Sequence, residues 1–187
     1  HDLQTGETSL ISVDSNGIQA SQSSYYPIIS GDGRYVSFVS SAKNLVTLNS
    51  SNYNEIFVHD RVTGITKQIS VTSNGNFGND SSYGAPKMSE DGQFILFVSN
   101  ASNLVPGDTN GVRDVFMHNQ LTGETIRVSV GTNGVETNNR SEDYYDISSN
   151  GRFVGFTSYA TNLVEDDTNG VTDIFVYDTK GYKKTRV

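Results

Sequence analysis

Short stretches of alternating apolar and polar residues, each bounded by turn residues, run along the chain. Between residues 26 and 71 there are four, at 26–30, 35–40, 55–60 and 66–71, and each is rich in β-branched or aromatic residues. Such alternation is typical of half-buried β-strands. An Asp-Gly pair separates the first two stretches and a Thr-Gly pair the last two, and glycine permits tight hairpins there. The pattern predicts a four-stranded antiparallel meander with one long connection, between its second and third strands.

The four-stranded pattern occurs three times. Gly33, Gly92 and Gly151 are spaced by 59 residues, and the same step relates three Asn-Leu-Val segments at 44–46, 103–105 and 162–164. A Thr-Gly pair at 63–64 recurs at 122–123, and again at 5–6 with a slip of one residue that we assign to a loop. The repeats therefore mark units of about 59 residues, at approximately 8–66, 67–125 and 126–187, within a single domain that covers residues 1–187.

A meander of this kind cannot bury both faces alone, so it must stack on its neighbouring copies. Radial stacking gives a β-propeller, in which each repeat is one four-stranded blade. A β-sandwich and a closed barrel are the competing all-β folds, but neither predicts a long period with four strands in each repeat. The sequence thus predicts an all-β fold, a β-propeller with three four-stranded antiparallel blades.

The segment Asp-Gly-Arg-Tyr-Val-Ser-Phe-Val-Ser at 32–40, Asp-Ile-Phe-Val-Tyr-Asp at 173–178 and the Thr-Gly pairs together resemble the TolB-like branch of the WD-repeat-like propellers. The resemblance covers essentially the whole chain. It is specific as to fold and weak as to function, because such blades occur in periplasmic, secreted and cell-surface bacterial proteins with many roles. It implies that the first strand of each blade lines the central channel and that the fourth lies on the rim.

Three blades are fewer than the four to eight of typical propellers. The chain begins in the phase of the end of a third strand and ends in the phase of the middle of a fourth, where Arg186 aligns with Arg127. Either the chain is an excerpt from a longer propeller, or three-bladed arcs associate head to tail into a six-bladed ring or a filament. In the second case we expect a complete fourth-strand segment at 8–13 and a partial one at 183–187 to compete for, or share, the place beside a third strand.

Composition narrows the function classes. The net charge of −8 argues against a nucleic-acid partner, because such surfaces need clustered Lys and Arg, and it suits a soluble protein that attracts cations. The chain has no cysteine, which excludes disulfides, thiolate metal sites and a cysteine nucleophile. No apolar run approaches the roughly 20 residues of a membrane span.

The long connection between the second and third strands carries the candidate metal ligands. Two copies have the pattern Asp-x-Asn-Gly-x-x-Asp, and a turn at Gly lets alternate oxygen ligands point toward a calcium ion. The predicted calcium ligands are Asp108, Asn110, Asp114, Asp167, Asn169 and Asp173. The same residue types also form ordinary Asx turns without an ion, and this alternative stays open. The first copy has Asn49, Ser51 and Glu55 at these positions, so we expect it to bind weakly or not at all.

Side chains of the first strands are the candidate ligand-binding groups, if the strand order that the resemblance implies holds. They are Tyr26, Lys87, Tyr145 and Asp146. Tyrosines with scattered charge suit a glycan or peptide surface, but packing between blades explains them at least as well. His59 and His118 occupy one repeat position, which favours a structural role at a strand end over a shared catalytic or metal site.

The sequence contains no recognisable catalytic constellation. No partner can be placed for a glycosidase carboxylate pair, and a Gly-x-Ser-x-Gly motif is absent. We therefore expect a non-enzymatic, extracellular, cell-surface or periplasmic propeller module that calcium stabilises, and that serves protein–protein interaction or self-assembly. Its partner is a second copy or further blades of a longer chain. A glycan- or peptide-binding propeller and a propeller-type lyase or hydrolase domain are the alternatives.

Overall fold

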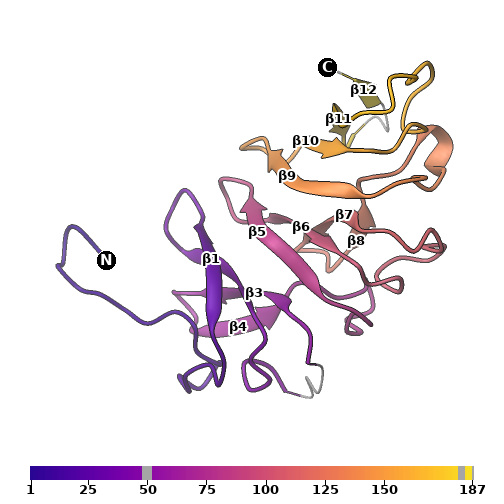
Figure 1. Ribbon diagram of the computed structural model, residues 1–187. Helices are drawn as coiled ribbons and strands as arrows, with labels where there is room; N and C mark the ends of the chain where they lie inside the picture. The colour runs from indigo at the N-terminus through magenta and orange to yellow at the C-terminus, as the bar shows by residue number, and fades with distance from the viewer. Residues whose placement is uncertain (48–51, 181–183, 187) are drawn as a thin grey trace.

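The computed structural model describes residues 1–47, 52–180 and 184–186. Twelve strands form three separate four-stranded antiparallel sheets, each with its strands in sequence order. Within the described residues the one helical element is the short 3-10 turn Thr132–Gly134 (η1). Figure 1 shows the three sheets fanned out one after another, as successive blades. The predicted fold, an all-β arc of three four-stranded blades, is confirmed.

The first blade contains β1 (Ser24–Ile29), β2 (Tyr35–Ser40), β3 (Glu55–Asp60) and β4 (Ile65–Gln68). The second contains β5 (Ser82–Met88), β6 (Phe94–Ser99), β7 (Asp114–Asn119) and β8 (Thr125–Arg127). The third contains β9 (Ser141–Ile147), β10 (Phe153–Ser158), β11 (Asp173–Asp178) and β12 (Lys184–Arg186). The second and third strands match the predicted bounds. The fourth strand of the first blade ends earlier than predicted, because the Ile56 N–H bonds the Ser70 hydroxyl at 3.0 Å instead of a backbone carbonyl.

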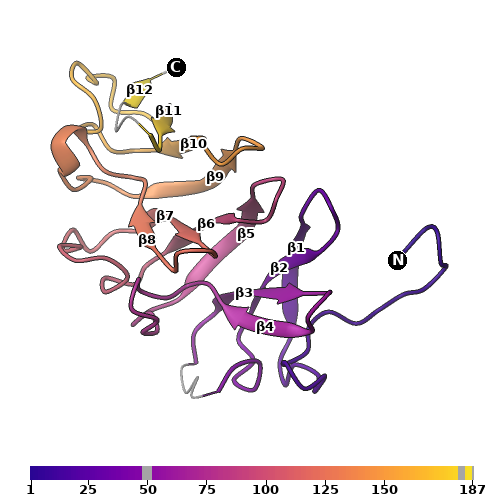
Figure 2. The same cartoon turned by 180° about the vertical axis from the view of Figure 1, so that it is seen from behind.

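The first strands hold the blades side by side. β1 lies beside β5 and β5 beside β9, whereas the fourth strands form the opposite edges of the sheets. Seen from behind in Figure 2, β4 and β8 lie in front of the strands that precede them. This is the strand order that the resemblance implies.

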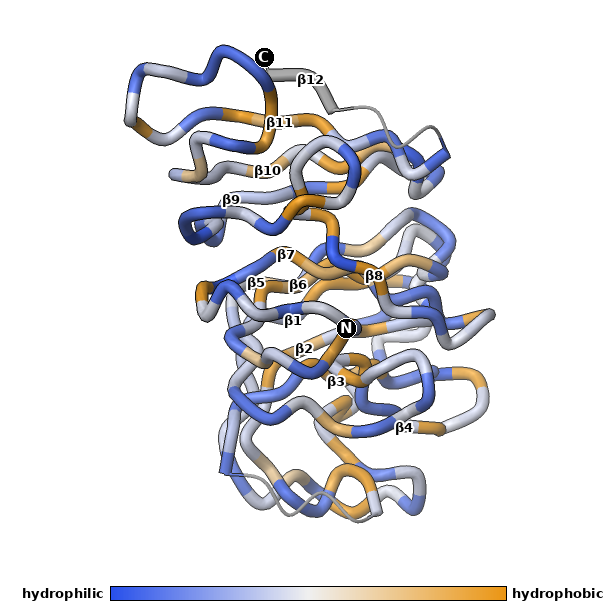
Figure 3. Tube along the Cα trace, turned by 90° about the vertical axis from the view of Figure 1, so that its right-hand side faces the viewer, coloured by the Kyte–Doolittle hydropathy of each residue, from blue (hydrophilic) through white to orange (hydrophobic). Residues whose placement is uncertain are grey.

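The core lies between the blades. In blade one, Ile56 and Val58 of β3 share a buried cluster with Phe97 and Phe116 of blade two, and the two rings stack at 5.8 Å. In Figure 3 hydrophobic residues occur along the middle strands, and many of the loop residues are hydrophilic. Burying a side chain of this kind contributes about 1.5–3 kcal/mol, so the clusters shared between blades stabilise their stacking.

In the first and second blades, an aromatic residue rests on a turn glycine of the next blade. A Cβ atom at Gly92 would lie 2.5 Å from the ring of Tyr35, and one at Gly151 would run into the ring of Phe94. Both glycines have positive φ, 75° and 71°, as their tight turns require. The Gly31 N–H also donates to the carbonyl of Glu90 in the next blade, at 2.7 Å. The 59-residue spacing of the glycines thus marks the contact between blades.

The predicted strand at residues 8–13 is wrong. The N-terminal end of the segment before β1 reaches away from the blades. Ile11 and Ala20 pack against the core of blade one, and the one β-bridge of the segment joins Val13 to Gln19. Its turn is nevertheless formed, because His1 Nδ1 and Thr8 Oγ1 lie 2.9 Å apart, as His59 and Thr66 do. Without a third strand beside it, the segment has no ladder to join. The predicted strand at 183–187 corresponds to β12, with Lys183 and Val187 outside the described residues.

The one-residue slip in the repeat lies in a strand, not in a loop as predicted. In β1 the pairing passes from Tyr25 opposite Val39 to Ile28 opposite Ser37, which leaves one extra residue in a bulge. In β5 and β9 the corresponding bulge has two extra residues. A bulge absorbs the difference because its residues stay outside the hydrogen-bonded ladder.

We predict that Gly151→Ala destabilises the protein more than Gly123→Ala. Both glycines have positive φ, which costs alanine about 1–2 kcal/mol. Only at Gly151 does the added methyl group meet the ring of Phe94, and overpacking adds about 1–3 kcal/mol. Urea unfolding measures both losses. Equal losses would show that the ring of Phe94 moves aside from the added methyl group without cost.

Candidate functional site

A groove lies where the bulges of the first strands meet the loops that lead into the third strands. Its volume is about 1390 Å³. The aromatic part of its lining comes from Tyr25, Tyr26, Tyr83 and Tyr144. The polar part comes from Asn54, Asn100, Arg113, Asn139, Arg140 and Asp143. Since all three blades contribute, the groove exists only because they are stacked.

The bulge in β1 places two adjacent tyrosines in the groove. In a regular strand, successive side chains point to opposite faces of the sheet. Tyr26 has φ of 54°, a left-handed conformation that costs a non-glycine residue about 1–2 kcal/mol. Tyr25 and Tyr26 therefore both line the groove, 54% and 58% exposed, with ring centroids 6.4 Å apart. The corresponding bulge of β5 has Gly84 at φ of 72°, where the same conformation is unstrained.

The structure brings one of the four predicted ligand-binding residues, Tyr26, to the groove. In β9 it is Tyr144, 76% exposed, that lines the groove, whereas Tyr145 is 5% exposed and belongs to the core between blades two and three. Burial also raises the pKa of Tyr145. Lys87 and Asp146 lie beyond the bulges, opposite Leu96 and Gly155, and do not line the groove.

Both arginines of the groove are paired with carboxylates. Arg113 lies 3.2 Å from Asp143 and 3.6 Å from Glu142, and its Nε donates to the carbonyl of Ser141. Arg140 lies 3.1 Å from Glu142, with its guanidinium over the ring of Tyr159. The charges at this end of the groove therefore balance locally.

A buried arginine anchors the loop 108–114, which supplies Arg113 to the groove. The guanidinium of Arg127 lies 2.9 Å from Asp108, 3.3 Å from Asp114 and 3.1 Å from Glu136. Its side chain is 5% exposed and that of Asp114 is fully buried. Glu136 also accepts hydrogen bonds from the backbone and hydroxyl of Thr109, both at 2.6 Å. The loop is thus fixed on both sides.

The cluster separates the pKa values of its carboxylates. Burial raises the pKa of Asp108 to about 6, although Arg127 opposes this effect. Hydrogen bonds from Thr109 lower the pKa of Glu136 to about 2, with a further contribution from Arg127. The difference follows from the surroundings, because Glu136 is the more exposed of the two groups and accepts more hydrogen bonds.

The predicted calcium ligands thus surround an arginine in the second blade. The Asn110 side chain serves as in an Asx turn, since its oxygen accepts the Val112 N–H and its amide donates to Asp114 at 3.0 Å. In the third blade Asn169 does the same with Val171 and with Asp173, at 3.3 Å. Asp167 is also buried there, 7% exposed. Both loops have the geometry of the alternative left open, the Asx turn.

The positive and negative charges of the cluster change together between blades. The first blade has Gln68 at the position of Arg127 and Phe77 at that of Glu136. Glu55 remains, and it accepts a hydrogen bond from the Ser70 hydroxyl at 2.6 Å. The loop residues Asn49 and Ser51 lie outside the described residues.

Over the part of the chain that the structure describes, no three His, Asp or Glu side chains are arranged to hold a metal ion. In blade two the guanidinium supplies the cation, so a calcium ion would have to displace it. Calcium binding stays a prediction. Sequence reasoning missed Arg127 and Glu136 because they lie outside the loop motif. Both are replaced by uncharged residues in the first repeat, and this joint replacement could have identified them as partners.

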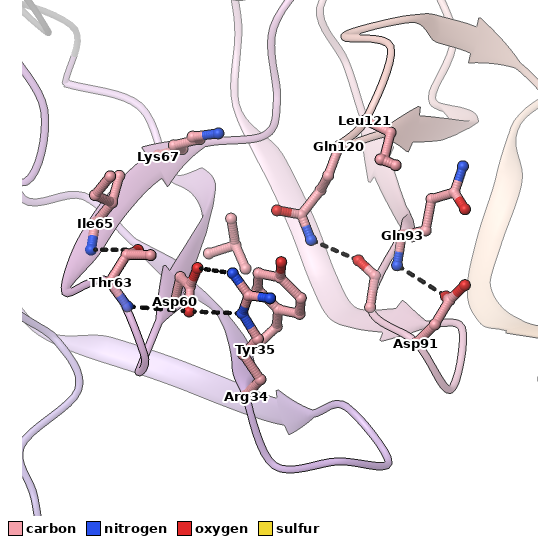
Figure 4. A pocket seen from close by; sticks show the side chains of 12 residues that line it. Arg34, Tyr35, Asp60, Thr63, Ile65, Lys67, Asp91, Gln93, Gln120 and Leu121 are labelled. Carbon is pink, nitrogen blue, oxygen red and sulfur yellow. Dashed lines mark hydrogen bonds and ion pairs between the residues drawn. The ribbon is translucent and has the colours of Figure 1, made fainter.

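A second hollow, of about 500 Å³, lies between the first and second blades (Figure 4). On one side Arg34 forms a bidentate ion pair with Asp60, at 2.7 and 3.0 Å, which holds the pKa of Asp60 well below its usual range. On the other side Gln120 bonds the Gly92 carbonyl. Because Arg34, Asp60 and Gln120 already have partners within their own blades, we assign this hollow to the seam between blades.

The opposite pKa shifts of Asp108 and Glu136 predict opposite effects of pH. The folded pKa of Asp108 lies above its unfolded value near 3.8, so its contribution is present below pH 4 and is lost as the pH rises to 6. As the pH rises from 4 to 6, the free energy of unfolding of the parent should therefore fall relative to that of Asp108→Asn, which has no carboxyl at this position. Urea titrations along a pH series measure it.

Glu136→Gln is the matched control for Asp108→Asn. Its folded pKa is depressed, so the contribution of Glu136 is present above pH 4.5 and is lost as the pH falls to 2. As the pH rises from 2 to 4.5, the free energy of unfolding of the parent should therefore increase relative to that of Glu136→Gln. A flat difference between parent and Asp108→Asn from pH 4 to 6 would contradict the buried, proton-binding state of Asp108.

Comparison with family models gives no match, and comparison with curated proteins gives none. Among solved structures, a putative TolB from Agrobacterium tumefaciens is 16% identical over 88% of this chain and 48% of its own, with a TM-score of 0.51. The β-propeller domain of the Trilobed protease from Pyrococcus furiosus is 14% identical over 90% of this chain and 44% of its own (TM-score 0.56). An oligogalacturonate lyase in complex with manganese is 12% identical over 88% and 40% (TM-score 0.52).

The chain spans less than half the length of each of these structures, and identities this low show the fold alone. The fold neighbours include TolB-like, peptidase and lyase propellers, so they do not select one activity. The described residues contain no helix long and apolar enough to cross a membrane. The resemblance seen in the sequence holds at the level of structure: the chain has three blades of the β-propeller fold that TolB-like proteins share.

Proposed function

We propose that the chain is a non-enzymatic protein-interaction module, which stacks the open face of its third blade on a further blade. The observation that supports this is the exposure of one side chain, that of Ile174. Ile174 is 54% exposed, whereas its repeat equivalents Ile56 and Val115 are fully buried under the blade that follows each of them. The face that the following blade covers in blades one and two is exposed to solvent in blade three.

Neighbours of Ile174 follow the same rule. Val176 is half-buried, whereas Met117, its equivalent in the second blade, is buried. Phe153 is 41% exposed, although its equivalent Phe94 rests on Gly151 of the next blade. The open face therefore carries the apolar residues that join the blades elsewhere.

A second copy of the chain fits this face. Its first blade carries Gly33, with φ of 73°, at the position that accepts an aromatic ring in the other blades, and Phe38 and Phe57 in the core behind it. Head-to-tail contact would lay Phe153 of one copy over Gly33 of the next. The same contact suits further blades of a longer chain.

The contact should be weaker than those within the chain. Thr157 stands where the second blade has Val98, and Gly155 where it has Leu96, so less apolar area is available for burial. We expect a reversible association. A location outside the cytoplasm, extracellular, at the cell surface or periplasmic, belongs to the same proposal, and the TolB-like fold supports it.

Light scattering of the purified chain across a concentration series tests the stacking. We expect a molar mass above that of one chain at high concentration. Ile174→Asp should bring the mass down to one chain, because a charge on the open face cannot be desolvated cheaply. Val62→Asp is the control, since Val62 is 74% exposed in the turn between β3 and β4. A monomeric parent at every concentration would overturn assembly from copies of this chain.

Calcium stabilisation is the second testable part of the proposal, and the two Asp-x-Asn-Gly-x-x-Asp loops support it. We expect the melting temperature to be higher in millimolar calcium than in chelator, because an ion that binds only the folded state stabilises it. Asp173→Asn and Asp114→Asn should each reduce the effect. Equal melting temperatures in calcium and chelator would leave the Asx turn as the whole role of these loops.

A further inference from the structure

The groove offers aromatic faces that are set by the backbone. Tyr25 and Tyr26 come from one bulge and Tyr144 from another, and all three are more than half exposed. Tyr83 lies between them in sequence and space, with its hydroxyl bonded to the Asn100 amide at 3.0 Å. A tyrosine side chain has only two rotatable torsions, so it loses little conformational freedom when a ligand covers its ring.

The polar groups of the groove suit hydroxyl groups rather than charges. Asn54, Asn100 and Asn139 contribute side-chain amides to the groove. Asn100 donates one amide hydrogen to Tyr83 and the Asn139 oxygen accepts the Arg140 N–H, so it is their other donors and acceptors that would meet sugar hydroxyls. Arg113 and Arg140 are already paired with Glu142 and Asp143, so neither offers an uncompensated positive charge. The chain as a whole carries a net charge of −8, which repels an anionic ligand.

The volume of the groove selects an extended ligand. At about 1390 Å³ it exceeds the roughly 300–1000 Å³ of common small-molecule pockets. A pyranose ring has one face of C–H groups and an edge of hydroxyls, so successive rings of a chain match tyrosine faces flanked by amides. We infer that this groove binds an uncharged oligosaccharide, with its sugar rings over Tyr26 and Tyr144.

The site goes beyond the proposed stacking function and does not depend on it, because every lining residue belongs to one chain. The backbone of Tyr26 strengthens the inference. Its φ of 54° is the one strained position of β1, and it sets the ring beside that of Tyr25. Strain of this kind persists where surrounding structure enforces it, and it clusters at binding sites.

Isothermal titration calorimetry with three uncharged hexasaccharides, namely cellohexaose, the hexamer of N-acetylglucosamine and mannohexaose, tests the inference. We expect at least one of them to bind, and a hexamer of galacturonate and an uncharged hexapeptide to bind more weakly or not at all. Tyr26→Ala and Tyr144→Ala should each weaken binding by roughly tenfold or more, as loss of a central aromatic contact does. Alanine at 26 keeps a Cβ and therefore the backbone strain, so the change isolates the ring.

Tyr53→Ala is the matched control, because Tyr53 is 38% exposed and lies outside the groove. It should bind as the parent does, and Tyr26→Phe should too. Urea midpoints establish that each variant is folded. Ile174→Asp should keep the affinity, so failure of blade stacking and failure of the groove site are distinguishable.

Four results would overturn the inference. They are no binding of any uncharged hexasaccharide, unchanged affinity in both tyrosine-to-alanine variants, tighter binding of the galacturonate hexamer or the hexapeptide, and loss of binding in Ile174→Asp.

Discussion

Contact between successive blades is the constraint on which the rest of the structure depends. A single four-stranded sheet of this sequence has apolar residues on both faces, and only a neighbour removes them from water. The cluster around Phe97 and Phe116 belongs to two blades at once, and the ring of Tyr35 lies against Gly92 of the next blade. Cooperativity therefore runs across the seams. A change in one blade should be felt in the free energy of the next.

Charged groups at the seams and loops are exchanged in complementary sets. Arg34 with Asp60 recurs as Arg152 with Asp178, and as the uncharged Gln93 with Asn119 in the middle blade. The buried cluster of Arg127 is treated in the same way, because the first blade replaces both Arg127 and Glu136 by uncharged residues. Removing one partner of a buried pair leaves an uncompensated charge, whereas replacing both is nearly neutral. Comparison of the repeats therefore identifies which charged residues act as pairs, because both members are replaced together.

The fold was predictable from the sequence because each blade repeats the same contacts, and a shared period reveals them. The groove was less predictable. Tyr144 and Tyr145 are identical in type and adjacent, and the length of the bulge decides which one faces the groove and which one the core. Arg127 could not be predicted, because its partners are loop residues and Glu136, and no local sequence motif connects them. The segment at 8–13 has the composition of a strand but no partner strand, and pairing decides its state.

The shorter bulge of β1 has a consequence for how such repeats diversify. One residue more or less in a bulge changes which side chains face the channel, while the ladder on both sides keeps its partners, as Ser24 opposite Ser40 and Ile29 opposite Val36 show. Insertions and deletions, which usually disrupt a strand, are confined here to the bulge, where they leave the flanking ladder intact. The inner surface of a propeller can therefore acquire new recognition residues at little cost to its architecture.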